Sequence, residues 1–146
     1  MADMITERIL QNPALCIDHA GVGELVILMH GIGGNRTNWT EQVKALSPHF
    51  HVVAWDARGY GGSDDYDGAL DFNDFAHDVV RVLDHFNAET AHIGGLSMGG
   101  RISQVFYNLY PERVKTLSLI ATFTGFADFS DAEKQKFVDL RLKPLV

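Results

Sequence analysis

The chain has 146 residues, 46% of them apolar, which is enough for one domain with a sizeable core. Its formal net charge of −7 and its scattered acidic residues argue against nucleic acid or an anionic membrane as a partner. No apolar run approaches the ~20 residues that cross a bilayer, and residues 1–8 lack the apolar core of a signal peptide. Cys16 has no second cysteine to pair with, so we expect a cytoplasmic protein in which Cys16 is a small buried residue.

In chain order, residues 4–9 and 14–19 are predicted to form a short antiparallel hairpin around a turn at residues 11–13. Further apolar runs predict strands at residues 25–29, 52–55, 91–93 and 114–121. Apolar residues at three- and four-residue spacing predict helices at residues 38–46, 72–86, 98–109 and 131–141. We expect Asn38 to cap the first helix and Ser130 the last, with His77 and His85 solvated on the outer side of the second.

The run 95–99, Gly-Leu-Ser-Met-Gly, has the pattern G-x-S-x-G and lies between a predicted strand and a predicted helix. This is the context of a nucleophile elbow, in which a sharp turn holds the serine hydroxyl at the carboxyl end of the strand. The glycines two residues either side of Ser97 let strand and helix pass closely. The pattern alone also fits a glycine-rich turn, but its context favours a nucleophile at Ser97, with the Met98 N–H receiving an oxyanion.

A second glycine-rich loop, residues 31–34, follows the strand at residues 25–29. Such a loop can cradle a phosphate or supply the second oxyanion donor of a hydrolase. The phosphate motifs are absent, because the loop contains neither G-K-[ST] nor G-x-G-x-x-G. We therefore expect the Ile32 N–H to be an oxyanion donor. His30 leads this loop, where it is expected to brace the turn by hydrogen bonds instead of acting as a base.

Two other segments have both a functional and a structural interpretation. Asp56 and Arg58, in the loop at residues 56–63, could bind substrate, but we favour a loop pinned by the fork of donors on Arg58. The phenylalanines of residues 123–129 could line an apolar substrate cleft or belong to the ordinary core, and the core is slightly favoured.

Alternating strands and helices predict an α/β chain with a mostly parallel sheet. Three motifs in this order, at residues 30–34, 56–63 and 95–100, resemble the amino-terminal half of an α/β-hydrolase, and residues 110–114 resemble the family's lead into its sixth strand. The resemblance covers essentially the whole chain and is strongest to 3-oxoadipate enol-lactonases and related esterase-like members. It implies a mostly parallel sheet with helices on both faces, truncated after the sixth strand and the start of a lid.

The same resemblance implies that residues 1–124 are the amino-terminal part of the hydrolase core and residues 125–146 the beginning of the lid. It implies a nucleophile at Ser97 and oxyanion donors at Ile32 and Met98, with no metal or organic cofactor required.

The sequence departs from the family in its catalytic histidine and acid, which follow the serine along a family chain. All seven histidines precede Ser97: His19, His30, His49, His51, His77, His85 and His92. The place that holds the acid in some members, after the sixth strand, is Ala-Thr-Phe at residues 121–123. We therefore expect a complementary carboxy-terminal polypeptide to carry the acid and the histidine. Without it, the outer edge of the strand at residues 114–121 would be bare and apolar.

The predicted function is that of a serine hydrolase that cleaves a small-molecule carboxylic ester or lactone by acyl transfer from Ser97. Alternatives on the same fold are hydrolysis of a carbon–carbon bond or an amide, and cofactor-free haloperoxidase-like activity. A different class is a non-catalytic, hydrolase-like ligand-binding protein.

Overall fold

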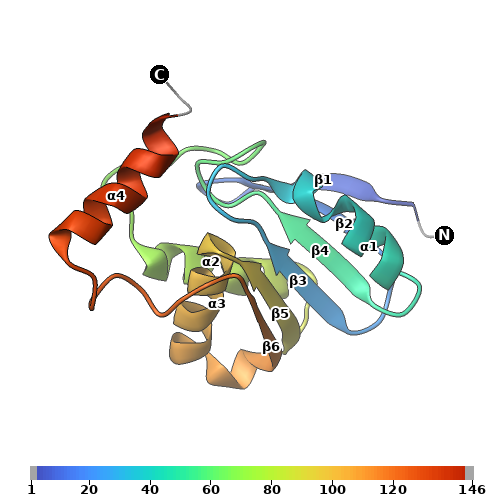
Figure 1. Cartoon of the computed structure of the whole chain (residues 1–146). Coiled ribbons are helices and arrows are strands. Elements are labelled where there is room, and N and C mark those ends of the chain that lie inside the picture. Colours follow the sequence, from blue (N-terminus) through green and yellow to red (C-terminus); the bar gives the residue numbers. More distant parts are fainter. Residues whose placement is uncertain (1–2, 144–146) are drawn as a thin grey trace.

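The computed structural model describes residues 3–143, so residues 1, 2 and 144–146, at the outer ends of the predicted segments 1–124 and 125–146, lie outside it. A six-stranded sheet in the order β1-β2-β4-β3-β5-β6 forms the centre of the molecule (Figure 1). The strands are β1 (Ile5–Ile9), β2 (Leu15–Ala20), β3 (Leu25–Met29), β4 (His51–Trp55), β5 (Ala91–Leu96) and β6 (Val114–Ile120). Strands β4, β3, β5 and β6 pair in parallel, while β1 and β2 form the predicted antiparallel hairpin.

The helices are α1 (Thr40–Leu46), α2 (Phe72–His85), α3 (Met98–Leu109) and α4 (Asp131–Leu142), with two short 3₁₀ turns, η1 (Arg36–Trp39) and η2 (Pro111–Arg113). The predicted cap of the first helical segment was wrong. Asn35, not Asn38, begins it: the Asn35 side chain accepts from the Thr37 N–H, and Asn38 reaches back to the Asn35 N–H at 2.8 Å. Ser130 caps α4 as predicted, with Glu133 completing a capping box.

Successive side chains of the central strands point to opposite faces of the sheet, and each face carries an apolar layer. Ile27 of β3 and Val53 of β4 are fully buried against α2 and α3, in a core that includes Val79 and Ile102. The neighbouring residues, such as Val52, face the opposite side and pack with Val43 of α1. Because side chains alternate across a strand, both faces of the parallel strands need helical cover, and both have it (Figure 1). The expected α/β-hydrolase architecture, with helices on both faces, is confirmed.

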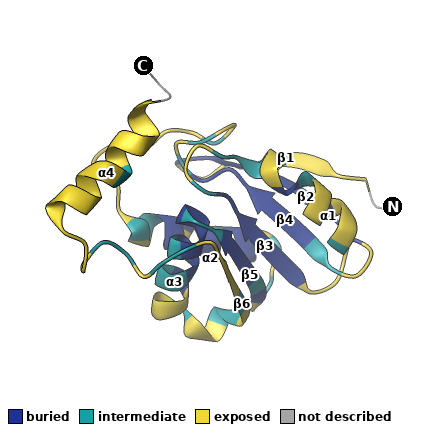
Figure 2. Cartoon of the chain, viewed as in Figure 1, coloured by how far each residue is buried: buried dark blue, intermediate teal, exposed yellow. Residues whose placement is uncertain are grey.

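The last part of the described chain is much more exposed than the rest (Figure 2). β6 lies at the edge of the sheet and leaves Leu119 and Ile120 45% and 42% exposed, as expected for a strand with no outer neighbour. The strand ends at Ile120 because Ala121 takes a left-handed φ of +46°. α4 buries none of its residues and stands away from the sheet in Figure 1. The boundary between core and lid near residue 125 stays a prediction. Within residues 3–143, no helix is long and apolar enough to span a membrane.

Candidate active site

Ser97 occupies a strained turn between β5 and α3. Its backbone has φ +52° and ψ −110°, a combination that costs on the order of 1–3 kcal/mol and persists only where the surroundings fix it. The Ser97 N–H donates to the Ile120 carbonyl at 2.9 Å, and the Thr122 hydroxyl donates to the Ser97 carbonyl at 2.8 Å. The end of β6 and the Thr122 side chain therefore hold the serine in this conformation.

The glycines around Ser97 are required by close packing. A Cβ added to Gly95 would collide with the Gly99 carbonyl, and one added to Gly99 would collide with the Met29 carbonyl of β3. The beginning of α3 consequently lies directly against the end of the neighbouring strand. This is the strand–turn–helix geometry that the elbow motif predicts.

The glycine loop after β3 adjoins the serine. A Cβ added to Gly31 would lie 3.9 Å from Ser97 Oγ, so the loop and the hydroxyl are neighbours. The Gly34 N–H donates to the Gly31 carbonyl at 3.0 Å, and Gly33 has φ +76°, which together define a tight turn of type II. Within residues 3–143 the Ile32 N–H, inside this turn, has no hydrogen-bond acceptor.

The Met98 N–H is likewise unpaired among the described residues, as expected for the first N–H of a helix. Ile32, Ser97 and Met98 line one pocket of about 180 Å³. The other lining residues are Tyr60, Leu70, Phe72, Arg101, Phe123, Phe126 and Phe137. All three predicted site residues are thus brought together, two of them as unused backbone donors beside a serine hydroxyl. Their role as oxyanion donors stays a prediction.

His30 is a structural residue, as the sequence indicated. It is fully buried, and its Nδ1 lies 2.8 Å from the Gly31 carbonyl while its Nε2 lies 3.1 Å from the Ala57 N–H. The ring must therefore donate from Nδ1 and accept at Nε2, which is the neutral imidazole. Burial lowers the pKa of His30 and favours this neutral form. With both nitrogens occupied, His30 braces the loop and leaves no nitrogen to serve Ser97 as a base.

Asp56 and Arg58 also have structural roles, which the sequence analysis favoured over substrate binding. The buried Asp56 carboxylate accepts from the Arg36 guanidinium at 2.6 Å and from the Gly62 N–H at 2.7 Å. Arg58 makes a two-pronged pair with the buried Asp78 carboxylate of α2, at 2.7 and 2.8 Å. These contacts tie the loop that follows β4 to the loop that follows β3 and to α2, so the loop is pinned in place.

The phenylalanines of residues 123–129 do not belong to the ordinary core, which the sequence analysis had slightly favoured. Phe126 packs edge-on against Phe137 of α4 with ring centroids 4.6 Å apart, and Phe123 stacks on Phe129 at 5.7 Å. The buried core contains none of them. Because α4 lacks the long apolar stripe that would dock it on the sheet, the phenylalanines pack on one another, and Phe123, Phe126 and Phe137 line the Ser97 pocket instead.

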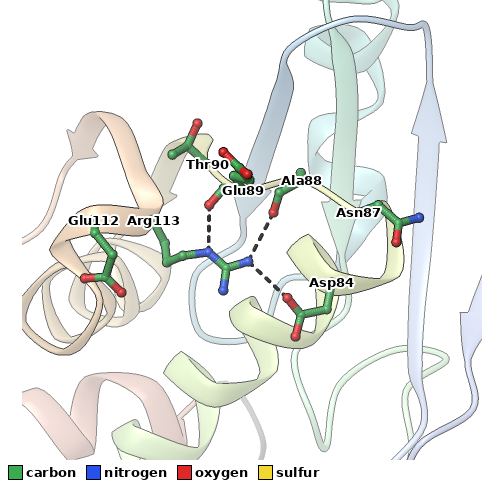
Figure 3. A pocket seen from close by; sticks show the side chains of 7 residues that line it. All are labelled: Asp84, Asn87, Ala88, Glu89, Thr90, Glu112 and Arg113. Carbon is green, nitrogen blue, oxygen red and sulfur yellow. Dashed lines mark hydrogen bonds and ion pairs between the residues drawn. The ribbon is translucent and has the colours of Figure 1, made fainter.

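A larger cavity, of about 630 Å³, lies at the opposite end of the strands and has a different character (Figure 3). Arg113 crosses it and donates to the Glu89 carbonyl at 2.7 Å, the Ala88 carbonyl at 3.1 Å and the Asp84 carboxylate at 3.0 Å. These bonds fasten the end of α2 and the start of β5 to the turn before β6. Across residues 3–143, no group of three histidine, cysteine or acidic side chains could hold a metal ion.

Sequence reasoning missed two residues that the structure brings to the site. Thr122 holds the Ser97 carbonyl, which only the pairing of β5 with β6 could reveal. Arg101 lines the pocket from the first turn of α3. The sequence could have indicated this position, because Arg101 follows Ser97 by only four residues at the start of a predicted helix.

A serine on a strained strand–helix elbow, facing a glycine loop at the carboxyl end of a parallel sheet, defines an α/β-hydrolase type of site. A model of the alpha/beta hydrolase fold matches residues 24–142. The chain belongs to this family.

Comparison with curated proteins gives relatives of several activities. The dihydrolipoyllysine-residue acetyltransferase component of the acetoin cleaving system of Pseudomonas putida is 38% identical over 100 residues, 68% of this chain and 27% of that protein. Epoxide hydrolase B of Mycobacterium tuberculosis is 38% identical over 94 residues, 62% of this chain and 26% of that protein. The 3-oxoadipate enol-lactonase 1 of Acinetobacter baylyi is 33% identical over 97 residues, 66% of this chain and 36% of that protein.

Among solved structures, E-2-(acetamidomethylene)succinate hydrolase superposes with a TM-score of 0.85 at 26% identity, over 97% of this chain and 52% of that one. The chain spans about half the length of this structure and between 26% and 36% of the length of the three curated relatives named above.

Proposed function

We propose that the protein is a serine hydrolase that cleaves a carboxylic ester or lactone by acyl transfer. The observation that carries this proposal is the meeting of three groups at one pocket. The Ser97 hydroxyl lies there on a strained turn, and the two backbone donors Ile32 and Met98 have no acceptor among residues 3–143. Unused N–H groups next to a nucleophile suit a reaction in which negative charge develops on a carbonyl oxygen.

In the proposed reaction, Ser97 Oγ attacks the carbonyl carbon and the carbonyl oxygen becomes an oxyanion. The Ile32 and Met98 N–H groups would each donate to it, and removal of one such donor typically slows a reaction about 10²- to 10³-fold. The carbon–oxygen bond to the leaving group then breaks, which gives an acyl-Ser97 and an alcohol. Attack of water on the acyl-Ser97 releases the acid and regenerates the hydroxyl.

The proton of Ser97 needs a base from elsewhere. No histidine among the described residues lines the Ser97 pocket, and both nitrogens of His30 are engaged. We propose that a complementary polypeptide segment carries the histidine and its acid and packs beside the bare edge of β6. Its position there would supply the missing neighbour of an exposed apolar strand.

Ester and lactone chemistry is favoured over the other activities found among the relatives. As their names state, 3-oxoadipate enol-lactonase 1 acts on a lactone, E-2-(acetamidomethylene)succinate hydrolase on that succinate, and epoxide hydrolase B on an epoxide. Opening an epoxide leaves the negative oxygen on the side away from the nucleophile, where donors beside Ser97 would not reach it. A carbonyl places its oxyanion beside the nucleophile. Hydrolysis of a carbon–carbon bond or an amide proceeds through the same kind of oxyanion and is the alternative activity. We also propose a cytoplasmic location.

A fluorophosphonate probe, with imidazole added to take the Ser97 proton, tests the proposal, because its fluoride leaves without help from a general acid. The phosphorus–oxygen bond to Ser97 should form and fluoride should be released, giving a mass increase on the wild-type chain. Ser97→Ala should not be labelled, while Ser118→Ala, which removes an exposed serine of β6, should label as the wild type does. Equal labelling of the wild type and Ser97→Ala would instead indicate a non-catalytic binding protein.

A further inference from the structure

Arg101 is the one charged side chain among the described residues that line the Ser97 pocket. Arg101 lies in the first turn of α3, four residues after Ser97, which precedes the helix, and both residues line the same pocket. The Arg101 N–H donates to the Ser97 carbonyl at 3.1 Å, which fixes the two residues within one turn. The guanidinium is therefore a positive charge built into the same pocket as the nucleophile.

The partners of Arg101 are unusual within this protein. Its guanidinium donates to the neutral Gln104 amide at 3.1 Å and lies 6.0 Å from the centre of the Phe72 ring. The other half-buried arginines each hold a carboxylate: Arg36 with Asp18 and Asp56, Arg58 with Asp78, Arg81 with Asp78, and Arg113 with Asp84. Among residues 3–143, no carboxylate pairs with Arg101.

A half-buried guanidinium without an anion has donors to spare and is only partly solvated, so an incoming carboxylate would gain charge-assisted hydrogen bonds. The rest of the pocket is apolar, with Phe72, Phe123 and Phe126 among its walls. Its volume of about 180 Å³ is below the several hundred Å³ of sites for drug-sized molecules. The pocket thus combines a small apolar space, a serine and one unpaired positive charge.

We propose that Arg101 is a specificity-determining residue that binds a free carboxylate on the substrate. The substrate would be a small ester or lactone that carries an acid group a few bonds from the scissile carbonyl. This inference rests on the proposed function, because it assigns the substrate class of the same site. Arg101 would hold the acid end while Ser97 attacks the carbonyl, and the phenylalanines would cover the carbon chain between them.

Two activated esters of glutaric acid test the assignment on the intact chain. One is the mono-p-nitrophenyl ester, which has a free carboxylate, and the other is the p-nitrophenyl methyl diester, in which the carboxylate is masked. Imidazole is added as the base that the described chain lacks; in both reactions the Ser97 oxygen–acyl bond forms, the bond to p-nitrophenolate breaks, and the hydroxyl proton passes to imidazole. Acylation is followed by intact mass, and we expect the free acid to react about 10- to 100-fold faster.

The preference should disappear in Arg101→Gln and be largely retained in Arg101→Lys, which keeps the charge. Arg141→Gln is the matched control: it removes the exposed arginine that stacks on Phe137 of the pocket wall, and it should keep the preference. A structural role of Arg101 would slow both esters alike. Equal reaction of the two esters with the wild type, or an unchanged preference in Arg101→Gln, would overturn the assignment.

A second readout separates this inference from the proposed function. Benzoate and benzamide are titrated onto the chain while the Arg101 Nε–H signal is followed by NMR, which does not require Ser97 to react. Benzoate should bind at least about tenfold more tightly than benzamide, and Arg101→Gln should remove the difference. If neither ester acylates Ser97, the proposed function fails and this titration decides the inference alone. Equal binding of the two compounds would then refute it.

Discussion

The two ends of the sheet differ in how they use their polar groups. At the amino end of the parallel strands, the larger cavity is crossed by Arg113, whose guanidinium joins two carbonyls and a carboxylate (Figure 3). At the carboxyl end, the smaller pocket has a serine hydroxyl, two backbone N–H groups and a guanidinium that lacks an anion among the described residues. The larger cavity therefore does not coincide with the proposed site. The hydrogen-bonding groups without partners gather at the end of the sheet where we propose the active site.

The parallel arrangement explains this division. Each helix that follows a parallel strand begins at the carboxyl end of the sheet, where its first N–H groups and partial positive charge face outward. The loops that follow β3 and β5 meet there and bring Ile32 to Ser97. Ligands of open α/β sheets bind at this end. At the amino end, the bonds of Arg113 join α2, the start of β5 and the turn before β6.

The largest effect that would sharpen the comparison is expected from Gly99→Ala. An alanine in an ordinary helix position is about 1 kcal/mol more stable than glycine. Here the added methyl group would collide with the Met29 carbonyl, so we expect a loss of about 3 kcal/mol or more in the free energy of unfolding. Urea unfolding measures it. An unchanged or higher stability would show that β3 and α3 are not in the close contact described.

A smaller effect is expected at the amino end from Arg113→Ala. Loss of its bonds to two carbonyls and to Asp84 should cost about 1–2 kcal/mol, since the side chain is only half-buried. Fluorophosphonate labelling of the folded variant should stay at the wild-type rate. Glu112→Ala, in the same cavity, is the control and should change neither quantity. Slower labelling of Arg113→Ala would break the proposed division between the two ends.

The smallest effect is the pH dependence of stability. Burial lowers the pKa of His51, as does the neighbouring His19 at an Nε2–Nδ1 distance of 3.0 Å, while Glu7 opposes the shift. The pKa of His19 is lowered too, first by burial and further by His85. The unfolded chain, with its histidines near 6.5, therefore takes up protons first as the pH falls.

These histidines therefore contribute their full stabilisation above about pH 6.5. Their contribution to the free energy of unfolding decreases as the pH falls from there toward their lower pKa values in the folded state. Urea midpoints at pH 7.5 and 5.5 should differ more for the wild type than for the double variant His19→Gln and His51→Gln. The remaining dependence should come from His30 at the other end of the sheet, whose pKa burial also lowers. An identical dependence in both chains would contradict this assignment.

Local patterns were sufficient to predict most of the fold. The apolar run of β3 and the helical spacing of α2 lie within single elements, so neighbouring residues carry the signal. The elbow was predictable for the same reason, because its glycines and serine occupy five consecutive positions. The cap was missed because Asn35 and Asn38 are both suitable residue types, and only the 3₁₀ turn between them decides which one begins the helix.

The rest of the site depends on contacts between distant segments. The Arg36 guanidinium joins Asp18 of β2 to Asp56 after β4, a network that no local pattern encodes. Whether the phenylalanines near residue 126 join the core or line a pocket depends on whether α4 packs on the sheet, which their spacing does not specify. That Arg101 has no acidic partner is visible only when every carboxylate in the described chain has been placed.

The two outer strands give the molecule unequal flanks. β1 is short and carries Glu7 and Arg8 in its middle, charges that discourage another strand from adding to it. β6 is longer, and its edge is apolar because Leu119 and Ile120 are exposed. The backbone groups along this edge have no partner strand in the described chain. If two copies paired through this edge, the pairing would stop at a dimer, because only the charged β1 edges would stay free. Concentration is therefore a variable to control whenever this protein is handled in solution.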